Sequence, residues 1–362
     1  MIIKTLETQN FRNLRLGKIS FSDGVNILTG LNAQGKTNVI EALWLFSASK
    51  SFRTNNEKEF INHNSNYSEL KVGFIKNSRE QSAELRYYEK KRREIYLNDI
   101  KVKPSELIGN FSTVLFFPSH LNLIKEGPDM RRKFIDFAIS QIKPQYFSLI
   151  SDYNKVLFQR NNMLKSEDID QLQTLEAWDI KLAKLGARIY ILRKKYLKEL
   201  EKHAKNVIYE ISGGKETLSL EYLSVCGDEI DVWKTEEILL NKLFINRDRD
   251  LVLGYTDVGV HKDDLGIILN GKSAKAFASQ GQQRSAVMSL KLGEAEILKT
   301  VTDEYPILLF DDVFSELDKN RKNYIIEKIR DKQVIITACE NLTDFGESKL
   351  FEISDGYVKE AE

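Results

Sequence analysis

Apolar residues form short runs near both ends of the chain and a longer periodic pattern in its middle. Short apolar or alternating runs predict strands at residues 2–7, 19–21, 25–28 and 114–117. Between residues 69 and 103, three further runs alternate between apolar and polar positions, and Asn98-Asp99 supplies a turn. This segment therefore predicts a β meander.

The middle of the chain has a helical pattern. Residues 130–142 and 145–164 predict two helices. Over 174–211, apolar residues recur every three to four positions, which predicts one long amphipathic helix. Strand character returns at 218–223, and strands and helices alternate again from about 251.

This succession predicts an α/β domain that is interrupted by a helical insertion. We expect the domain to comprise residues 1–120 and 246–362, and the insertion to comprise residues 121–245. The length of 362 residues is sufficient for two domains.

A glycine-rich segment follows the strand predicted at 25–28 and precedes a helix-like apolar run. Its residues are Gly30, Leu31, Asn32, Ala33, Gln34, Gly35, Lys36 and Thr37. They fit G-x-x-x-x-G-K-[ST], the P-loop pattern, in which backbone N–H groups and a helix N-terminus surround phosphate oxygens. In such a loop Lys36 reaches the β- and γ-phosphates, and the Thr37 hydroxyl binds Mg²⁺. Because both flanks fit as well, we interpret the segment as a nucleotide site and not as a chance glycine turn.

A second apolar run, residues 306–310, ends in Asp311 and Asp312. Buried parallel strands are continuous apolar runs, and ligands bind at their carboxyl ends. We therefore predict that Asp311 holds Mg²⁺ and that Asp312 orients or deprotonates the attacking water. Lys36, Asp311 and Asp312 are the predicted catalytic residues. A strand capped by acidic turn residues is the alternative. Thr37 and Asp311 are 274 positions apart. Compact nucleotide kinases and small GTPases, in contrast, complete their sites within a single small domain.

Further motifs flank the two aspartates. Upstream, a predicted helix begins with Ser279, Gln280, Gly281 and Gln282. Side chains and free N–H groups at such a start grip a phosphate, and the segment resembles the signature loop of ABC-type ATPases. Downstream, Asp318 occupies the D-loop position, and Thr337 stands where ABC transporters carry a switch histidine.

Composition limits the remaining possibilities. The formal net charge of +1 gives no overall attraction to nucleic acid, so any basic surface is local. No apolar run is long enough to span a bilayer, and the apolar start of the chain is too short for a signal peptide. Cys226 and Cys339 form no metal-binding pattern. These features predict a cytoplasmic protein with no membrane partner.

Several segments resemble the RecF family, the SMC-like DNA-repair ATPases of bacteria, over the whole chain. These segments are 10–14 (NFRNL), 118–136 with RRKFID at 131–136, 279–285 (SQGQQRS) and 311–318 (DDVFSELD). Residues 259–264 read Gly-Val-His-Lys-Asp-Asp, which departs from the usual Gly-Pro-His-Arg-Asp-Asp at Val260 and Lys262. Ser119 and Glu126 are further departures.

The resemblance implies an ABC/SMC-type P-loop ATPase head with a β meander and an inserted helical arm domain. It implies binding of ATP and Mg²⁺, slow ATP hydrolysis and ATP-dependent dimerisation on DNA, at single-stranded gaps or their duplex junctions. It also implies work with RecR and RecO in loading RecA, and a part in the SOS response. The signature loop then completes the partner protomer's site, and Arg12 and Asn13 approach the nucleotide; a local turn contact is their alternative role.

Two basic segments are candidates for contact with DNA. Lys90, Lys91, Arg92 and Arg93 follow Tyr87 and Tyr88 in the predicted meander. The helical segment 181–205, which includes Lys194 and Lys195, carries nine lysines and arginines against two glutamates. A solvated loop and a solvated helix face are the alternatives for these segments. Bound phosphates would make affinity fall steeply with salt.

Three other residues keep open roles. Arg131 and Arg132 could serve DNA, a partner protein or the packing of the insertion. His261 lies beside Asp263 and Asp264, but no other histidine or cysteine joins it at ligand spacing, so a structural or interface role is preferred over a metal site.

Two other classes of function remain as alternatives. A P-loop kinase or transferase with an inserted domain would need an acceptor pocket and a lid with catalytic arginines, and would leave the signature loop unexplained. An ABC transporter ATPase subunit would carry a histidine at the position of Thr337. DNA-stimulated ATPase activity separates the first class from the RecF-like interpretation.

Overall fold

The structure is a computed structural model that describes residues 1–166, 174–339 and 345–361. The chain forms two compact units: unit 1 comprises residues 1–120 and 291–362, and unit 2 comprises residues 121–290. Within the described ranges, every helix is too short or too polar to cross a membrane.

Unit 1 contains a six-stranded sheet with the strand order β15-β14-β3-β13-β12-β8. The strands are β3 (Val25–Thr29), β8 (Thr113–Phe116), β12 (Ile307–Asp311), β13 (Val334–Thr337), β14 (Ser348–Ser354) and β15 (Tyr357–Glu360). All neighbours are parallel except β14 and β15, which form an antiparallel hairpin. Every residue of β8, β12 and β13 is buried, as the continuous apolar runs predicted.

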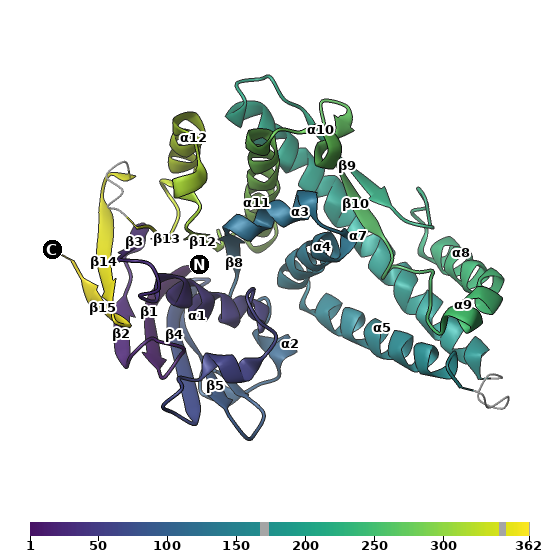
Figure 1. Ribbon diagram of the computed structural model, residues 1–362, viewed down its shortest axis with the longest axis horizontal. Coiled ribbons are helices and arrows are strands. Elements are labelled where there is room, and N and C mark those ends of the chain that lie inside the picture. Colours follow the sequence, from purple (N-terminus) through teal and green to yellow (C-terminus); the bar gives the residue numbers. More distant parts are fainter. Residues whose placement is uncertain (167–173, 340–344, 362) are drawn as a thin grey trace. The chain divides into compact units, whose positions relative to one another are not determined.

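Helix α1 (Lys36–Ala48) follows β3 directly and packs on β8, β12 and β13 (Figure 1). It is buried on nearly all sides from Val39 to Ser47, so it forms part of the core and not a surface stripe. The other helical elements of unit 1 are short. They are η1 (Glu57–Phe60), α2 (Pro104–Leu107), η3 (Phe314–Glu316) and α12 (Lys319–Ile329).

A second sheet of unit 1 confirms the predicted meander. It has the order β2-β1-β4-β5-β6-β7 and is antiparallel throughout. Its strands are β1 (Ile2–Gln9), β2 (Gly17–Ser20), β4 (Tyr67–Lys76), β5 (Arg79–Tyr88), β6 (Glu94–Leu97) and β7 (Ile100–Lys101). One face buries alternate residues such as Leu70, Val72 and Leu85. The other face carries cross-strand ion pairs, including Lys18–Glu7 and Arg86–Glu69.

Unit 2 is mainly helical. Its long helices are α4 (Pro128–Ile142), α5 (Pro144–Met163) and α7 (Leu175–Ile211), and α7 packs on α4, α5 and α8 (Figure 1). The remaining helices are α3 (Asn122–Lys125), α8 (Val232–Ile245), α9 (Arg247–Leu253) and α10 (Ala274–Phe277). The 37 residues of α7 bury one stripe at helical spacing, as predicted.

The second boundary of the insertion differs from our prediction of residue 245. Unit 2 continues to residue 290 because β9 (Leu218–Leu223) pairs over six residues with β10 (Asp264–Leu269), which also pairs with β11 (Lys272–Ser273). Residues 246–290 therefore belong with the helical unit. Two elements contain residues of both units: η2 (Pro118–Leu121) and α11 (Gln280–Thr302).

Candidate nucleotide site

The loop between β3 and α1 has the backbone that the P-loop pattern predicts. Gly30, Ala33 and Gly35 have φ values of 144°, 65° and 119°. A side chain at Gly30 is sterically blocked as well, since a Cβ there would lie 2.3 Å from the carbonyl oxygen of Ile353. The two glycines thus permit a tight turn at the start of a helix, where backbone N–H groups are free to bind an anion.

Lys36 is held against this loop. Its Nζ donates to the carbonyl oxygens of Gly30 at 2.5 Å and Leu31 at 3.1 Å, and the side chain is largely buried. The sulfur of Cys339, two residues after strand β13, lies 3.6 Å from Nζ. The ammonium group is therefore fixed at the mouth of the loop, where a phosphate oxygen could replace a carbonyl as its partner.

The two halves of the site meet at Asp311. Its Oδ1 accepts hydrogen bonds from the Thr37 hydroxyl at 2.9 Å and from the Thr337 hydroxyl at 2.8 Å. Thr337 Oγ1 in turn accepts from the backbone N–H of Asp312 at 2.9 Å. Since β13 lies between β3 and β12, Thr337 bridges the loop strand and the aspartate strand. The structure thus brings together Thr37, Asp311, Asp312 and Thr337.

Electrostatics set the two aspartates apart. Burial raises the pKa of Asp311, against the hydrogen bonds from Thr337 and Thr37 that lower it, and the neighbouring Asp312 adds a smaller increase. Asp312 is exposed and has a φ of 52°, and its Oδ1 accepts from the Ser315 hydroxyl at 3.1 Å. One carboxylate is therefore buried beside a hydroxyl, and the next is presented to solvent.

In unit 2, Ser279 directly precedes α11 and Gln282 lies in its first turn. The Ser279 N–H donates to Oε1 of Gln282, and the Gln282 N–H donates to the Ser279 hydroxyl, at 2.9 and 3.3 Å. This reciprocal pair is a capping box, which fixes the first turn of the helix. Ser279 and Gln280 are exposed, and Gly281 is half-buried. Asp318 has a similar local role in unit 1, because it caps α12 by accepting from the N–H groups of Asn320 and Arg321.

Comparison with known proteins identifies the family of this chain. The family model "RecF/RecN/SMC N terminal domain" matches residues 2–355. The "DNA replication and repair protein RecF" of Ruminiclostridium cellulolyticum is 40% identical over 370 residues, which cover 99% of each chain. The protein of the same name from a Thermoanaerobacter species is 41% identical over 362 residues, again covering 99% of each. The chain belongs to the RecF family.

Solved structures agree with this family. A structure of the recombination mediator protein RecF with ATP, in the RecFOR pathway, is 38% identical with a TM-score of 0.92, and covers 100% of this chain and 98% of that chain. The Smc head domain of Pyrococcus furiosus shares the fold at 16% identity, with a TM-score of 0.58 and coverage of 99% and 96%. The expected SMC-type ATPase head fold is thereby confirmed.

The opening motif of the RecF family lies against the P-loop. Asn13 Nδ2 donates to the carbonyl oxygen of Ala33 at 3.1 Å, and its Oδ1 accepts from Asn38 on α1 at 2.6 Å. Arg12 instead forms two hydrogen bonds with the carboxylate of Glu41 on α1, at 2.6 and 2.8 Å. The motif therefore makes two kinds of local contact. Asn13 supports the P-loop, and Arg12 pairs with the carboxylate of Glu41, which is fully buried.

Neither Glu41 nor Asn38 was predicted from the sequence. Glu41 also accepts from Ser51 at 2.5 Å and from Arg53 at 3.4 Å, so it organises the segment after α1 as well as the one before β2. A single carboxylate in the apolar run 39–45 was the available signal, because a buried charge requires partners.

Two segments that resemble the RecF family, 131–136 and 259–264, are joined by hydrogen bonds within unit 2. Arg131 forms two hydrogen bonds with the carboxylate of Asp264, at 2.6 and 2.9 Å, and Arg132 donates to the carbonyl oxygen of Asp263 at 2.6 Å. These contacts join 131–136 to 259–264, so packing of the inserted unit accounts for both arginines. His261 is half-buried, and its Nδ1 accepts from the Tyr153 hydroxyl at 2.8 Å. No group of metal-ligating side chains is found in the described ranges.

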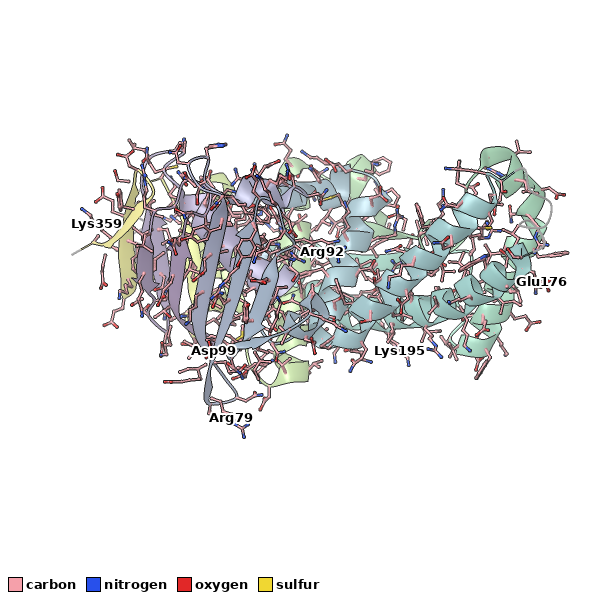
Figure 2. All side chains as sticks on the ribbon, turned by 90° about the horizontal axis from the view of Figure 1, so that it is seen from below. Arg79, Arg92, Asp99, Glu176, Lys195 and Lys359 are labelled. Atoms are coloured by element: carbon pink, nitrogen blue, oxygen red, sulfur yellow. The ribbon has the colours of Figure 1, made fainter. Side chains whose placement is uncertain are left out.

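The basic segment 90–93 after β5 contains two side chains with partners inside unit 1, Lys91 and Arg93, and two exposed ones, Lys90 and Arg92. Arg93 donates to the carbonyl oxygen of Ser49 at 2.6 Å and pairs with Glu57 at 2.9 Å. Lys91 lies 3.7 Å from the ring centroid of Tyr88. Lys90 and Arg92 are exposed, and neither forms an ion pair within the part of the chain that the structure describes. Figure 2 shows Arg92 at the opposite end of β5 from Arg79.

The basic stripe on α7 is partly internal. Arg193 is buried and forms two hydrogen bonds with Asp136, both at 2.8 Å. Lys194 donates to the Tyr190 hydroxyl at 3.1 Å and to Asp228 at 3.2 Å. Lys195 points outward and is exposed (Figure 2). The excess of positive charge counted along the helix thus overstates the charge that it presents to solvent.

Proposed function

We propose that this RecF-family chain is an ATP-switched DNA-binding protein of DNA repair and replication, with ATP and Mg²⁺ as its ligands and slow hydrolysis as its reset. The hydrogen bond between Thr37 and Asp311 carries the proposal, because it places a hydroxyl and a carboxylate of the two ATPase motifs 2.9 Å apart. The solved relative described as RecF with ATP supports the choice of nucleotide. We expect the protein to act in the cytoplasm.

The donor set fits Mg²⁺. Magnesium prefers hard oxygen ligands and is commonly held by one or two protein groups together with phosphate oxygens. Thr37 Oγ1 and Asp311 Oδ1 are such oxygens, and the buried carboxylate gains stabilisation from a nearby cation. When bound, the ion neutralises charge that develops on the phosphates.

The chain's own residues supply the remaining chemistry. Residues 30–37 bind the phosphates through backbone N–H groups, and Lys36 Nζ exchanges the carbonyl oxygens of Gly30 and Leu31 for phosphate oxygens. Asp312 accepts a hydrogen bond from the attacking water, and the Ser315 hydroxyl fixes its carboxylate. Thr337 holds Asp311 and the backbone of Asp312 in register.

Dimerisation on ATP is the second part of the proposal. Ser279, Gln280, Gly281 and Gln282 would contact the γ-phosphate bound to a partner protomer, with Asp318 near the shared interface. ATP then binds the closed dimer more tightly than the monomer and shifts the equilibrium towards it. The exposure of Ser279 and Gln280 at a helix start supports this role.

Sedimentation velocity with and without ATP tests this part. We expect Ser279→Arg to bind ATP with nearly unchanged affinity and to remain monomeric, because the larger cation fills the space of the partner's phosphate. Ser279→Ala is the matched control: it loses the cap to the Gln282 N–H, at a cost of about 1 kcal/mol, but leaves space for a partner. A Ser279→Arg dimer that forms as readily as the wild type contradicts the shared site.

Work on DNA is the third part. We propose that the dimer binds gapped DNA and acts with RecR and RecO in loading RecA and in the SOS response; the RecFOR pathway named for the solved relatives supports this. Stimulation of ATP hydrolysis by gapped DNA is the deciding assay. A rate that is independent of DNA but rises with a small phosphate acceptor would favour a kinase instead.

The loop 90–92 is the proposed DNA contact in unit 1, because Lys90 and Arg92 are exposed, with Lys195 and the half-buried Lys194 as candidates in unit 2. We expect Lys90→Glu combined with Arg92→Glu to weaken DNA binding at least tenfold and to reduce the slope of log affinity against log salt by about 2. Arg79→Glu changes an exposed charge at the opposite end of β5 and is the control. An equal effect of Arg79→Glu would indicate overall charge and not this loop.

A further inference from the structure

The turn of the β14–β15 hairpin lies against the P-loop. The N–H of Asp355 donates to Oε1 of Gln34 at 2.6 Å, and the Thr29 hydroxyl donates to the carbonyl oxygen of Phe351 at 3.1 Å. At the other end of the loop, Gly30 packs on the carbonyl of Ile353 so closely that no side chain fits. Both ends of the loop thus rest on one strand and its turn.

The same turn also supports Asn13. The N–H of Arg15 donates to the carbonyl oxygen of Gly356 at 2.9 Å. A Cβ at Gly356 would lie 1.9 Å from the carbonyl oxygen of Asn13, so the two backbones are in direct contact. Asn13 in turn binds Ala33 and Asn38 through its side chain. Gly356 therefore reaches the P-loop through Asn13, and Asp355 reaches it directly through Gln34.

We propose that the Asp355–Gly356 turn is a positioning element that holds the P-loop in its nucleotide-binding conformation. This inference rests on the proposed binding of ATP. An anion gains most from N–H groups that are already oriented, because the free energy of ordering the loop is then not lost on binding. The turn contacts the loop at Gln34 and, through Asn13, at Ala33, the segment that surrounds the phosphates.

A second turn of the chain provides a matched control. Asp355 and Gly356 have φ values of 49° and 78°, and Asn270 and Gly271, between β10 and β11, have φ values of 49° and 74°. Both are two-residue hairpin turns that require left-handed backbone. A Cβ at Gly271 meets no atom within 4 Å, whereas a Cβ at Gly356 meets Asn13. Alanine therefore introduces the same turn strain at both positions but displaces the P-loop only from Gly356.

Titration with a fluorescent ATP analogue, together with thermal unfolding of the nucleotide-free protein, tests the proposal. We expect Gly356→Ala to raise the Kd for ATP at least tenfold, and Gly271→Ala to leave it within twofold of the wild type although it lowers the unfolding temperature. Gln34→Ala removes only the acceptor for the Asp355 N–H, and we expect it to raise the Kd about threefold with little change in unfolding temperature.

The outcomes separate this inference from the proposed function. If the wild type binds no ATP, the proposed function fails. If the wild type binds ATP and both Gly356→Ala and Gln34→Ala bind it equally well, the positioning role is wrong. If Gly356→Ala does not fold, Gln34→Ala alone decides, since a purely structural role of the hairpin would leave its Kd unchanged.

Discussion

The hydroxyl of Thr37 donates to the carboxylate of Asp311 at 2.9 Å, although 274 positions separate the two residues in the chain. Asp311 ends β12, whereas Thr37 lies in the first turn of α1, after the loop that follows β3. Thr337, on the strand between β3 and β12, donates to the same carboxylate oxygen. The sheet therefore brings the two motifs together.

Asp311 is predicted to lower the unfolding free energy of the protein, although it is needed for the binding of ATP with Mg²⁺. Because burial raises its pKa, the folded state binds this proton more tightly than the unfolded state, and the contribution of Asp311 to stability falls as the pH rises above its usual 3.8. We expect Asp311→Asn to increase the unfolding free energy at pH 7 by about 1 kcal/mol and to abolish stabilisation by ATP with Mg²⁺. Urea unfolding at pH 7 and pH 4.5 measures both effects, and a gain that is larger at the lower pH contradicts the argument.

Arg12 is predicted to stabilise unit 1 through its ion pair with the buried Glu41. Its removal leaves Glu41 as a buried carboxylate with weaker partners, which costs about 3 kcal/mol. We expect this loss for Arg12→Ala in denaturant unfolding. Lys4→Ala breaks the exposed pair with Asp23 and should cost less than about 0.5 kcal/mol. Similar losses for the two variants would show that the buried carboxylate is tolerated.

Arg160 has the corresponding role in unit 2. This fully buried arginine on α5 pairs with Asp179 on α7 at 2.5 Å and with Asp250 on α9 at 2.7 Å. Arg160→Met leaves two buried carboxylates, and we expect a loss of about 3–5 kcal/mol. Lys155→Met on the same helix breaks only an exposed pair with Asp152 and serves as the control. Unfolding followed by circular dichroism compares them; equal midpoints refute the prediction.

His261 is predicted to make the protein sensitive to acid. Its Nε2 donates to the carbonyl oxygen of Thr256 and its Nδ1 accepts from the Tyr153 hydroxyl, so the neutral ring is fully bonded. Burial lowers its pKa from 6.5 to about 4, so the unfolded state binds the proton more tightly and stability is lost as the pH falls below 6.5.

We expect about 2 kcal/mol of unfolding free energy to be lost through His261 between pH 7 and pH 5. His261→Gln should remove this part of the pH dependence, whereas His63→Gln, at an exposed position, should not. Parallel pH profiles of the wild type and His261→Gln would place the acid sensitivity elsewhere.

The main features of the site could be predicted from the sequence because each belongs to a short segment. The P-loop is a turn whose glycines and flanking apolar runs are contiguous, and Asp311 ends an apolar run. The support of the P-loop could not be predicted in this way. Asn13 and Gly356 come from opposite ends of the chain, and their contact depends on a strand order that apolar patterns do not encode.

The positive charge that α7 presents to solvent was overestimated from the sequence, because the contacts that bury some of its cations come from distant segments. The sequence shows that Arg193 and Lys195 are both cationic, but helical spacing alone does not show that Asp136 on another helix accepts from Arg193. The boundary at residue 290 was likewise missed because the pairing of β9 with β10 joins strands that lie far apart in the sequence.

Strand β13 lies between β3, which leads into the P-loop, and β12, which ends at Asp311. The registers that align Leu28, Thr337 and Asp311 are all set by strands of unit 1, so Asp311 is held two strands away from β3, which leads into the loop before Thr37. Residues 121–290, which form unit 2, supply none of these three strands. Because the sheet of unit 1 fixes the distance between Thr37 and Asp311, unit 2 could be lengthened, shortened or replaced during evolution without changing that distance.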